Sequence, residues 1–411
     1  MRHAAGVLYD IYEFQRGWLA GMGAAAEWSA EMLQSPNHPF AKFGGPALGS
    51  ALEVFAHAAE TRGKPDFGLN STIIDGNVVA VTEEIVVRKP FGQLKRFVRD
   101  GITGQPRLLI VAPMSGHYAT LLRGTVERML PGHDVYITDW RDARQVPLSD
   151  GTFDLDDYVD YLIEFLEAVG PGAHMLAVCQ PSVPAYAAVA LMNGQNHPAT
   201  PRTLTMMGGP VDTREAPTAV NTVATQRPFA WFEQNVIQTV PMSYPGAGRK
   251  VYPGFLQLAG FMSMNLGSHM TSHWELFRHL VAGDDSSADA TKAFYDEYRS
   301  VCDMTAEFYL QTIDVVFQQH ALPKGDYIHH GNRVDPGSIT KTALLAIEGE
   351  RDDISGIGQT KAALTIATGL PDAEKKYFLA PGAGHYGIFN GSKWRDTIAP
   401  IVEGWIASHN V

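Results

Sequence analysis

One cysteine in the middle of the chain has the sequence context of an exposed nucleophile. The mostly apolar run 173–178 ends at Cys179, and Gln180 and Pro181 then lead into a segment of helical composition. A strand that turns sharply into a helix exposes the residue at the turn, in the arrangement called a nucleophile elbow. The usual pattern is Gly-x-Ser-x-Gly, and here Cys179 replaces the serine while Ala177 and Pro181 replace the glycines. Taken alone, Cys179 is equally well explained as an ordinary buried cysteine.

A histidine and a carboxylate follow this cysteine in an order that suits acyl transfer. Asp352 and Asp353 come shortly after the predicted strand 343–347, and His385 lies in a glycine-rich loop after the last predicted strand. A thiol nucleophile needs a base and an acid that orients it, and the order nucleophile, acid, histidine is that of α/β-hydrolases. We favour Asp352 because it directly precedes the residues that lead back into the fold. Asp353 and the earlier Asp139 are the alternatives.

Backbone amides are needed to hold the oxyanion that forms during acyl transfer. Gln180 follows the nucleophile and would supply one N–H, and the loop after the strand 108–112 would supply a second from Met114 or Ser115. Ser115 could instead be the nucleophile, but it has no elbow and precedes the first full strand–helix alternation. Cys302 has no matching partners, and we expect it to be structural.

The elements around these residues alternate in the manner of a mostly parallel sheet. Strands are predicted at 78–87, 108–112, 134–138, 173–178, 204–207, 343–347 and 376–379. Helices are predicted between them at 121–130, 155–169, 184–192, 359–368 and 394–408. The alternation pauses over 213–338, where helical stretches lie at 229–240, 269–282 and 288–317. We therefore predict an α/β-hydrolase fold with an inserted helical cap.

Three units follow from this pattern. We assign 1–65 to an N-terminal helical extension, 66–212 and 339–411 to the α/β core, and 213–338 to the cap. The extension has helices at 5–33 and 46–59, the first with apolar residues at helical spacing: Leu8, Ile11, Tyr12, Trp18, Leu19 and Met22. The cap carries large apolar residues: Phe229, Trp231, Phe232, Phe255, Phe261, Met262, Met264 and Trp274. Both sets could pack internally or meet a polymer, and the first helix could also form a homodimer contact.

Composition excludes several classes of protein. The chain of 411 residues has 32 basic and 44 acidic residues, a formal charge of −12, which disfavours a nucleic-acid partner. One basic cluster is interpreted as a solvated face at a strand end: Arg88, Lys89, Lys95, Arg96 and Arg99. Two cysteines make no disulfide framework and no metal-ligand spacing, and we expect neither metal nor cofactor. We also expect no signal peptide and no integral membrane contact, and thus a cytoplasmic protein.

The chain resembles the intracellular polyhydroxybutyrate (PHB) depolymerases. The motifs that carry the resemblance are Ala112–His117 (APMSGH), Val135–Arg141 (VYITDWR), Val178–Pro181 (VCQP), Glu348–Ile354 (EGERDDI) and Gly384–Phe389 (GHYGIF). They extend from about residue 70 onward, and the N-terminal helices are family-like too. The resemblance implies a thiol esterase that degrades amorphous poly(3-hydroxybutyrate) storage granules in the cytoplasm, with Cys179 as nucleophile, His385 as base and Asp352 as its orienting acid.

Three other functions remain open at this point. The related polyester synthases typically keep glycines around their cysteine, whereas this chain has Ala177 and Pro181, which favours degradation over synthesis. An acyl-thioester on Cys179 could be attacked by coenzyme A instead of water. A granule-binding protein without turnover is the remaining alternative, because a fold does not establish an activity. Retention of Cys179, Asp352 and His385 together argues against this last alternative.

Overall fold

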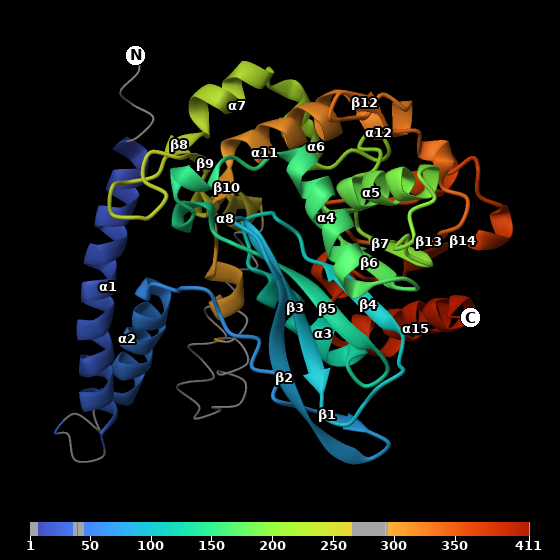
Figure 1. The fold of residues 1–411 in the computed structure, drawn as a ribbon. Coiled ribbons are helices and arrows are strands. Elements are labelled where there is room, and N and C mark those ends of the chain that lie inside the picture. The colour runs from blue at the N-terminus through green and yellow to red at the C-terminus, as the bar shows by residue number, and fades with distance from the viewer. Residues whose placement is uncertain (1–6, 36–38, 40–44, 265–291, 293–294, 411) are drawn as a thin grey trace.

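A large β-sheet forms the centre of the molecule (Figure 1). The computed structural model describes residues 7–35, 39, 45–264, 292 and 295–410. In this part of the chain the sheet has nine strands in the order β1-β2-β3-β5-β4-β6-β7-β13-β14. Their bounds are β1 Ser71–Ile74, β2 Asn77–Arg88, β3 Gly92–Arg99, β4 Arg107–Val111, β5 Asp134–Trp140, β6 His174–Val178, β7 Thr203–Met207, β13 Ala343–Gly349 and β14 Lys375–Ala380. Strand pairs from β5 to β14 are parallel, and the pairs that involve β1, β2 and β3 are antiparallel.

Helices cover both faces of this sheet, which explains why its central strands are apolar without alternation. The helices of this layer are α3 Arg123–Met129, α4 Leu155–Val169, α5 Ser182–Gly194, α13 Ala362–Ile366, α14 Gly391–Lys393 and α15 Ala399–His409. In Figure 1, α4 and α5 lie on one face and α3 and α15 on the other. All residues of β6, β7 and β13 are buried as a result. Short 3₁₀ turns occur at η1 Ala119–Leu122, η2 Ala143–Gln145, η3 Leu148–Asp150, η5 Pro336–Ser338, η6 Asp372–Glu374 and η7 Tyr386–Ile388, and a π turn at η8 Trp394–Ile398.

This topology confirms the predicted fold class. From β2 onward the strand order matches the α/β-hydrolase sheet, with β4 placed between β5 and β6 and with the nucleophile position directly after β6. The chain leaves the sheet after β7 and returns in β13, which pairs with β7 in parallel register from Ala343↔Thr203 to Ile347↔Met207. The segment between β7 and β13 is therefore an insertion in the chain between two neighbouring strands, and the parallel sheet itself stays continuous. The exact domain boundaries stay predictions.

The excursion between β7 and β13 is helical, with small sheets that the sequence did not indicate. Its helices are α6 Ala219–Gln226, α7 Phe229–Asn235, α8 Gly254–Met264, α11 Ala306–Gln311, which continues into the π turn η4 Thr312–Gln318, and α12 Ala321–Lys324. Its short strands are β8 Gln238–Thr239, β9 Lys250–Tyr252 and β10 Met304–Thr305 in one sheet, and β11 Ile328–His329 with β12 Asn332–Arg333 in another. The predicted helix 269–282 lies outside the described residues.

Two predicted helices of this region are too long. The helix predicted at 229–240 ends at Asn235, and the chain then forms β8 against β9. The helix predicted at 288–317 is broken at 300–305, where β10 pairs with β9. At this point the segment hydrogen-bonds to residues distant in sequence and does not continue the helix. The Cys302 N–H donates to Gly116 O (2.8 Å), and the Asp303 carboxylate accepts from Gly254 N (3.0 Å). Tertiary contacts override helix propensity at this point.

The interpretation of the basic cluster at 88–99 as a solvated face is wrong. The cluster belongs largely to β3, a strand missed because charged residues interrupt its apolar pattern. Lys95 donates to Glu83 and is 12% exposed in its side chain, Arg96 makes a two-bond contact with Asp134, and Arg99 is buried. Specific pairing on an antiparallel strand explains these charges.

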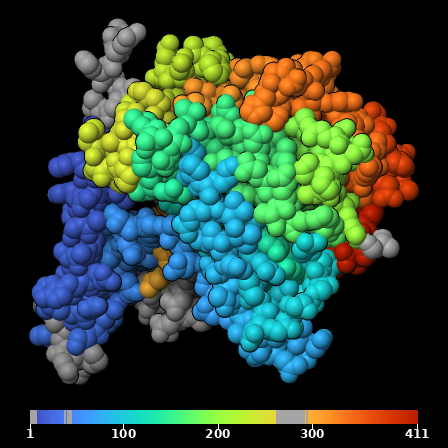
Figure 2. Space-filling model, viewed as in Figure 1, coloured from blue at the N-terminus to red at the C-terminus, as the bar shows by residue number. Residues whose placement is uncertain are grey.

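An antiparallel pair of helices, α1 Val7–Gln34 and α2 Gly45–Ala59, stands at the side of this body (Figures 1 and 2). The rings of Tyr9 and Tyr12 stack on Phe255 of α8, and the Tyr9 hydroxyl donates to Asp303 (2.5 Å). Small residues on the same side of α1 are buried, which allows close approach to α2. Among the described residues, no helix has both the length and the apolar character needed to cross a bilayer.

Candidate active site

Cys179 occupies a strained turn between β6 and α5. Its φ is +66°, a left-handed conformation that is uncommon for a residue with a side chain. The turn is closed on both sides, because the Cys179 N–H donates to Met207 O (2.7 Å) and the Cys179 carbonyl accepts from Ser182 N (3.0 Å). Helix α5 starts at Ser182. The geometry is therefore that of a nucleophile elbow, although the flanking glycines are absent.

The space for this turn comes from two glycines of the neighbouring strand end, which the sequence analysis did not assign to the site. A Cβ on Gly209 would lie 2.0 Å from Ser182 Oγ and 3.0 Å from Cys179 O. Gly208 has φ +60°, and a Cβ there would lie 3.2 Å from His385 Cε1. The sequence did contain a signal for them, because two consecutive glycines directly follow the predicted strand 204–207, where the alternation of strands and helices pauses. A backbone that must pass so close to the turn requires glycine.

His385 and Asp352 meet as expected. His385 Nδ1 and Asp352 Oδ2 are 2.8 Å apart, and the exposed fractions of the two side chains are 5% and 0%. The other carboxylate oxygen, Oδ1, accepts from the backbone N–H groups of Ile354 (2.9 Å) and Ser355 (2.8 Å). These two bonds fix the carboxylate, so that one oxygen remains directed at the imidazole.

The environment of His385 favours its protonated form. Burial by itself would lower the pKa of His385, but Cys179 and Asp352, through charge and hydrogen bonding, raise the pKa well above its usual value. The imidazole therefore interacts with the sulfur on one side and the carboxylate on the other. This is the arrangement in which a histidine can remove a proton from a thiol and stay charged beside the thiolate.

The two alternative carboxylates are placed elsewhere. Asp353 is exposed, although it directly follows Asp352. Asp139 is fully buried and accepts hydrogen bonds from Lys64 Nζ (2.6 Å) and Gln93 Nε2 (2.7 Å). The structure therefore brings only Asp352, of the three candidates, into hydrogen-bond contact with His385 among the described residues.

A buried glutamate that the sequence analysis did not single out holds the loop of Asp352 in place. Glu348, near the end of β13, is fully buried. Its carboxylate accepts from the backbone N–H groups of Gly358, Thr360 and Lys361 at 2.8–2.9 Å and from the Tyr377 hydroxyl at 2.7 Å. The sequence signal for this role was a charged residue in an otherwise apolar strand. A buried carboxylate is stable only when it is hydrogen-bonded, so it must hold neighbouring donors. This anchoring also shortens the predicted helix 359–368 to Ala362–Ile366.

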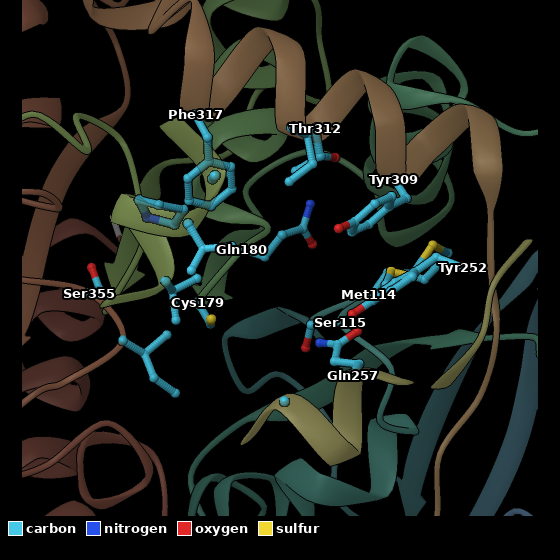
Figure 3. A pocket seen from close by; sticks show the side chains of 18 of the residues that line it. Met114, Ser115, Cys179, Gln180, Tyr252, Gln257, Tyr309, Thr312, Phe317 and Ser355 are labelled. Atoms are coloured by element: carbon cyan, nitrogen blue, oxygen red, sulfur yellow. The ribbon is translucent and has the colours of Figure 1, made fainter. Parts of the chain in front are cut away.

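The expected oxyanion donors lie around the thiol. Met114, Ser115 and Gln180 line the same cavity as Cys179 (Figure 3). In the part of the chain that the structure describes, the backbone N–H groups of these residues have no hydrogen-bond acceptor. Ser115 faces the cavity from the loop after β4, and it is Cys179, with Asp352, that raises the pKa of His385.

The cavity above Cys179 has a volume of about 420 Å³ and is walled mainly by apolar groups. Figure 3 shows Tyr309, Thr312 and Phe317 projecting into it from one continuous cap helix, with Gln257 near Ser115. The ring of Tyr252 stacks on that of Tyr309. None of these five residues was identified as part of the site from the sequence. The cavity can therefore hold an extended, weakly polar acyl chain against the thiol.

The large apolar residues of the cap divide between packing and cavity wall. Phe232 is buried, lines the cavity and packs edge-on against Trp231. Phe255 stacks on α1, and Phe229 is 39% exposed. The side chains of Phe261, Met262 and Met264, together with Trp274, lie outside the described residues.

Cys302 has a different environment from Cys179. Its thiol is buried and donates to His117 O (3.6 Å), and burial raises the pKa of the thiol well above its usual value. The adjacent His117 ring contacts Tyr298 O (3.0 Å), and burial lowers the pKa of this histidine to about 4. These groups connect the cap to the loop after β4.

One group of described residues could in principle hold a cation. Asp160, His329 and His330 place their ligand atoms within 4.8 Å of one another. Both histidines already hydrogen-bond to the two oxygens of Asp160, at 3.0 and 2.7 Å. None of the three lines the cavity at Cys179. The cluster is satisfied by its own hydrogen bonds.

Comparison with known proteins identifies one family. Residues 208–410 match the family model described as PHB de-polymerase C-terminus. The matched segment contains Asp352 and His385, and Cys179 precedes it. No protein of curated function matches the chain in sequence.

Solved structures with a similar course of the chain have low sequence identity. A 2-hydroxy-6-oxo-6-phenylhexa-2,4-dienoate hydrolase from Rhodococcus sp. strain RHA1 is 10% identical over 80% of this chain and 99% of its own, with a TM-score of 0.43. A monoacylglycerol lipase from Paleococcus ferrophilus is 12% identical over 74% and 96%, with a TM-score of 0.41. A thioesterase domain from the curacin biosynthetic pathway is 11% identical over 80% and 99%, with a TM-score of 0.42.

Proposed function

This chain belongs to the PHB depolymerase family through its residues 208–410, and we propose that it hydrolyses ester bonds of amorphous poly(3-hydroxybutyrate) through an acyl-thioester on Cys179. The observation that carries the proposal is the placement of the Cys179 thiol. It lies at a strained turn, beside a buried His385–Asp352 pair whose histidine has a pKa raised by Cys179, and on the wall of an apolar cavity. An inert cysteine needs none of these features.

The first half of the reaction forms the thioester. His385 takes the proton of Cys179, and the sulfur attacks an ester carbonyl of the polymer. Asp352 keeps the imidazole oriented and stabilises its charge, with its own second oxygen held by two backbone N–H groups. When the tetrahedral intermediate collapses, the C–O bond breaks and His385 gives its proton to the leaving hydroxyl end of the polymer.

Backbone amides stabilise the oxyanion. The N–H of Gln180 and that of Met114 or Ser115 lie at the cavity without acceptors in the described chain, so they need no rearrangement when charge develops on the carbonyl oxygen. Preorganised donors of this kind are worth about 3–4 kcal/mol each in comparable hydrolases.

The second half of the reaction restores the thiol. Water, deprotonated by His385, attacks the thioester carbonyl, the C–S bond breaks, and the acid is released while His385 returns the proton to Cys179. The products are 3-hydroxybutyrate and its oligomers. We place this reaction at storage granules in the cytoplasm, as the sequence analysis expects.

The test is release of soluble 3-hydroxybutyrate from amorphous granules by the purified protein, with Cys179→Ala and crystalline polymer as controls. Release by the wild type that disappears in Cys179→Ala supports the thiol depolymerase. Parallel reactions with coenzyme A, and with 3-hydroxybutyryl-coenzyme A without polymer, detect thiolysis and synthesis. A folded wild-type protein that releases nothing from granules contradicts the proposal.

A further inference from the structure

The first helix has an apolar face that is exposed. We call this face the outer stripe of α1; its members are Ile11, Phe14, Trp18, Met22, Trp28 and Met32. Together with Ala25 they follow one another at intervals of three or four residues, so they share one side of the helix. Phe14, Trp18 and Trp28 are 76%, 62% and 65% exposed. Such large apolar groups in a continuous row mark an interaction surface.

The opposite side of α1 is the one that attaches the helix to the body. Tyr9 and Tyr12 stack on Phe255, and Arg16 donates to the Tyr244 hydroxyl (3.1 Å). Further along, Ala26 and Ala30 are buried. The helix is thus held through its inner side, whereas the three aromatic residues of the outer stripe stay largely exposed. In Figure 2 the helix pair, coloured blue, forms the left margin of the molecule.

We propose that the outer stripe of α1 binds the surface of the insoluble polyester and holds the protein on it during degradation. This inference rests on the proposed function, since it takes the polymer as substrate. The helix has 28 residues and is therefore about 42 Å long. A row of this length contacts many monomer units at once, which gives attachment without a dedicated pocket.

The acidic residues of α1 favour an uncharged partner for the outer stripe. Beside the stripe the helix carries Asp10, Glu13, Glu27 and Glu31, and its one basic residue, Arg16, is already paired with Glu13 (2.7 Å). Helices that bind anionic membranes are instead rich in lysine and arginine. Two copies of α1 packed side by side would bring carboxylates next to carboxylates, without the opposite charges that usually flank such a contact. A neutral polyester carries no negative charge, so the carboxylates of α1 do not repel it as they would an anionic membrane or a second copy of α1.

The side chains of the stripe also match the hydrogen-bonding character of a polyester. The interior of such a chain offers ester oxygens as acceptors and contains no donors. The indole N–H groups of Trp18 and Trp28 are donors only, and their rings are amphipathic and suit a boundary between apolar material and water. The stripe therefore combines apolar area with donors that ester carbonyls can accept.

The test compares a stripe variant with a matched control. The stripe variant is Phe14→Gln, Trp18→Gln and Trp28→Gln, and the control is Ile73→Gln, Val78→Gln and Met242→Gln, three residues that are 64%, 76% and 88% exposed elsewhere. Each set is built in the active chain and in Cys179→Ala. The readouts are co-sedimentation with protein-free amorphous granules, binding to neutral and anionic phospholipid vesicles, molar mass in solution, and hydrolysis of a soluble 3-hydroxybutyrate trimer.

We expect the stripe variant to bind granules at least tenfold more weakly and to degrade them correspondingly more slowly. Its hydrolysis of the soluble trimer and its molar mass should equal those of the wild type, and the control should behave as wild type throughout. Unchanged granule binding by the stripe variant overturns the proposal, as does a halved molar mass or a loss of vesicle binding that exceeds the loss of granule binding. Failure of the wild type on the trimer would instead count against the proposed function, because binding is measured with Cys179→Ala.

Discussion

The two cysteines of this protein lie in environments that differ in almost every respect. Cys179 is partly exposed at a left-handed turn, on a cavity wall and beside His385. Cys302 is buried in the cap, beside the carbonyl of His117 and near the buried carboxylates of Asp142 and Asp303. At the first site the thiol raises the pKa of the imidazole beside it. At the second, burial and nearby negative charge raise the pKa of the thiol itself.

This difference shows that reactivity is a property of the surroundings. Both thiols lie near carboxylates, but only at Cys179 does an imidazole come between the sulfur and the carboxylate. Without a cation in that position, a carboxylate raises the pKa of a neighbouring thiol and makes it inert.

The largest expected effect is on turnover. Cys179→Ala should lower the rate of ester hydrolysis by at least about 10³-fold, because the proposed acyl intermediate forms on this thiol. Cys302→Ala should keep activity within about twofold and reduce the free energy of unfolding by about 1 kcal/mol. Hydrolysis of the soluble trimer and thermal unfolding measure both. Loss of activity in Cys302→Ala, with an intact fold, would contradict the assignment.

A second substitution isolates the carboxylate. Asp352→Asn should lower activity by about 10³-fold, since the amide cannot stabilise the charged imidazole. The adjacent Asp353→Asn is the matched control and should have little effect, because that side chain is exposed. Hydrolysis of the soluble trimer by the two variants measures the difference. Equal losses in both variants would mean that the loop, and not the carboxylate at 352, is what matters.

A third measurement compares the thiols directly. At pH 7, iodoacetamide should label Cys179 at least about 100-fold faster than Cys302, because Cys179 is partly exposed beside His385, whereas burial keeps the thiol of Cys302 protonated and out of reach. Peptide mapping by mass spectrometry gives both rates in one sample. A soluble ester substrate should protect Cys179 alone.

The smallest effect concerns the histidine itself. Cys179 and Asp352 both raise the pKa of His385, against the effect of burial. Cys179→Ala removes one of these two contributions, so the pKa of His385 should fall, and in the native state the ring should lose its proton at a lower pH than in the wild type. Titration by NMR detects the change. A pKa that rises or stays fixed would show that the thiol does not interact with the ring.

The sequence was sufficient for the parallel part of the sheet and for the contact between His385 and Asp352. Apolar runs such as 108–112 predict parallel strands because helices on both faces leave no polar side. The spacing of Cys179, Asp352 and His385 along the chain follows strand ends of one sheet, so their meeting could be predicted from the element order.

Other features depend on contacts between distant segments. Gly208 and Gly209 serve the site because another strand's turn passes over them. The strand β3 was missed because its charges are paired across strands. For α1 the spacing predicts an amphipathic helix, but the side that packs is the tyrosine and alanine side, and no pattern within a single helix could indicate which side that is.

The pairing of β7 with β13 has a consequence for biosynthesis. The thiol is synthesised before the cap, whereas Asp352 and His385 are synthesised after it, on loops that are in place only once β13 has paired with β7 and β14 with β13. Bringing such distant strands together is a slow step in folding. A growing or incompletely folded chain therefore carries Cys179 without His385 beside it, and the proposed hydrolysis should begin only when the last strands complete the sheet.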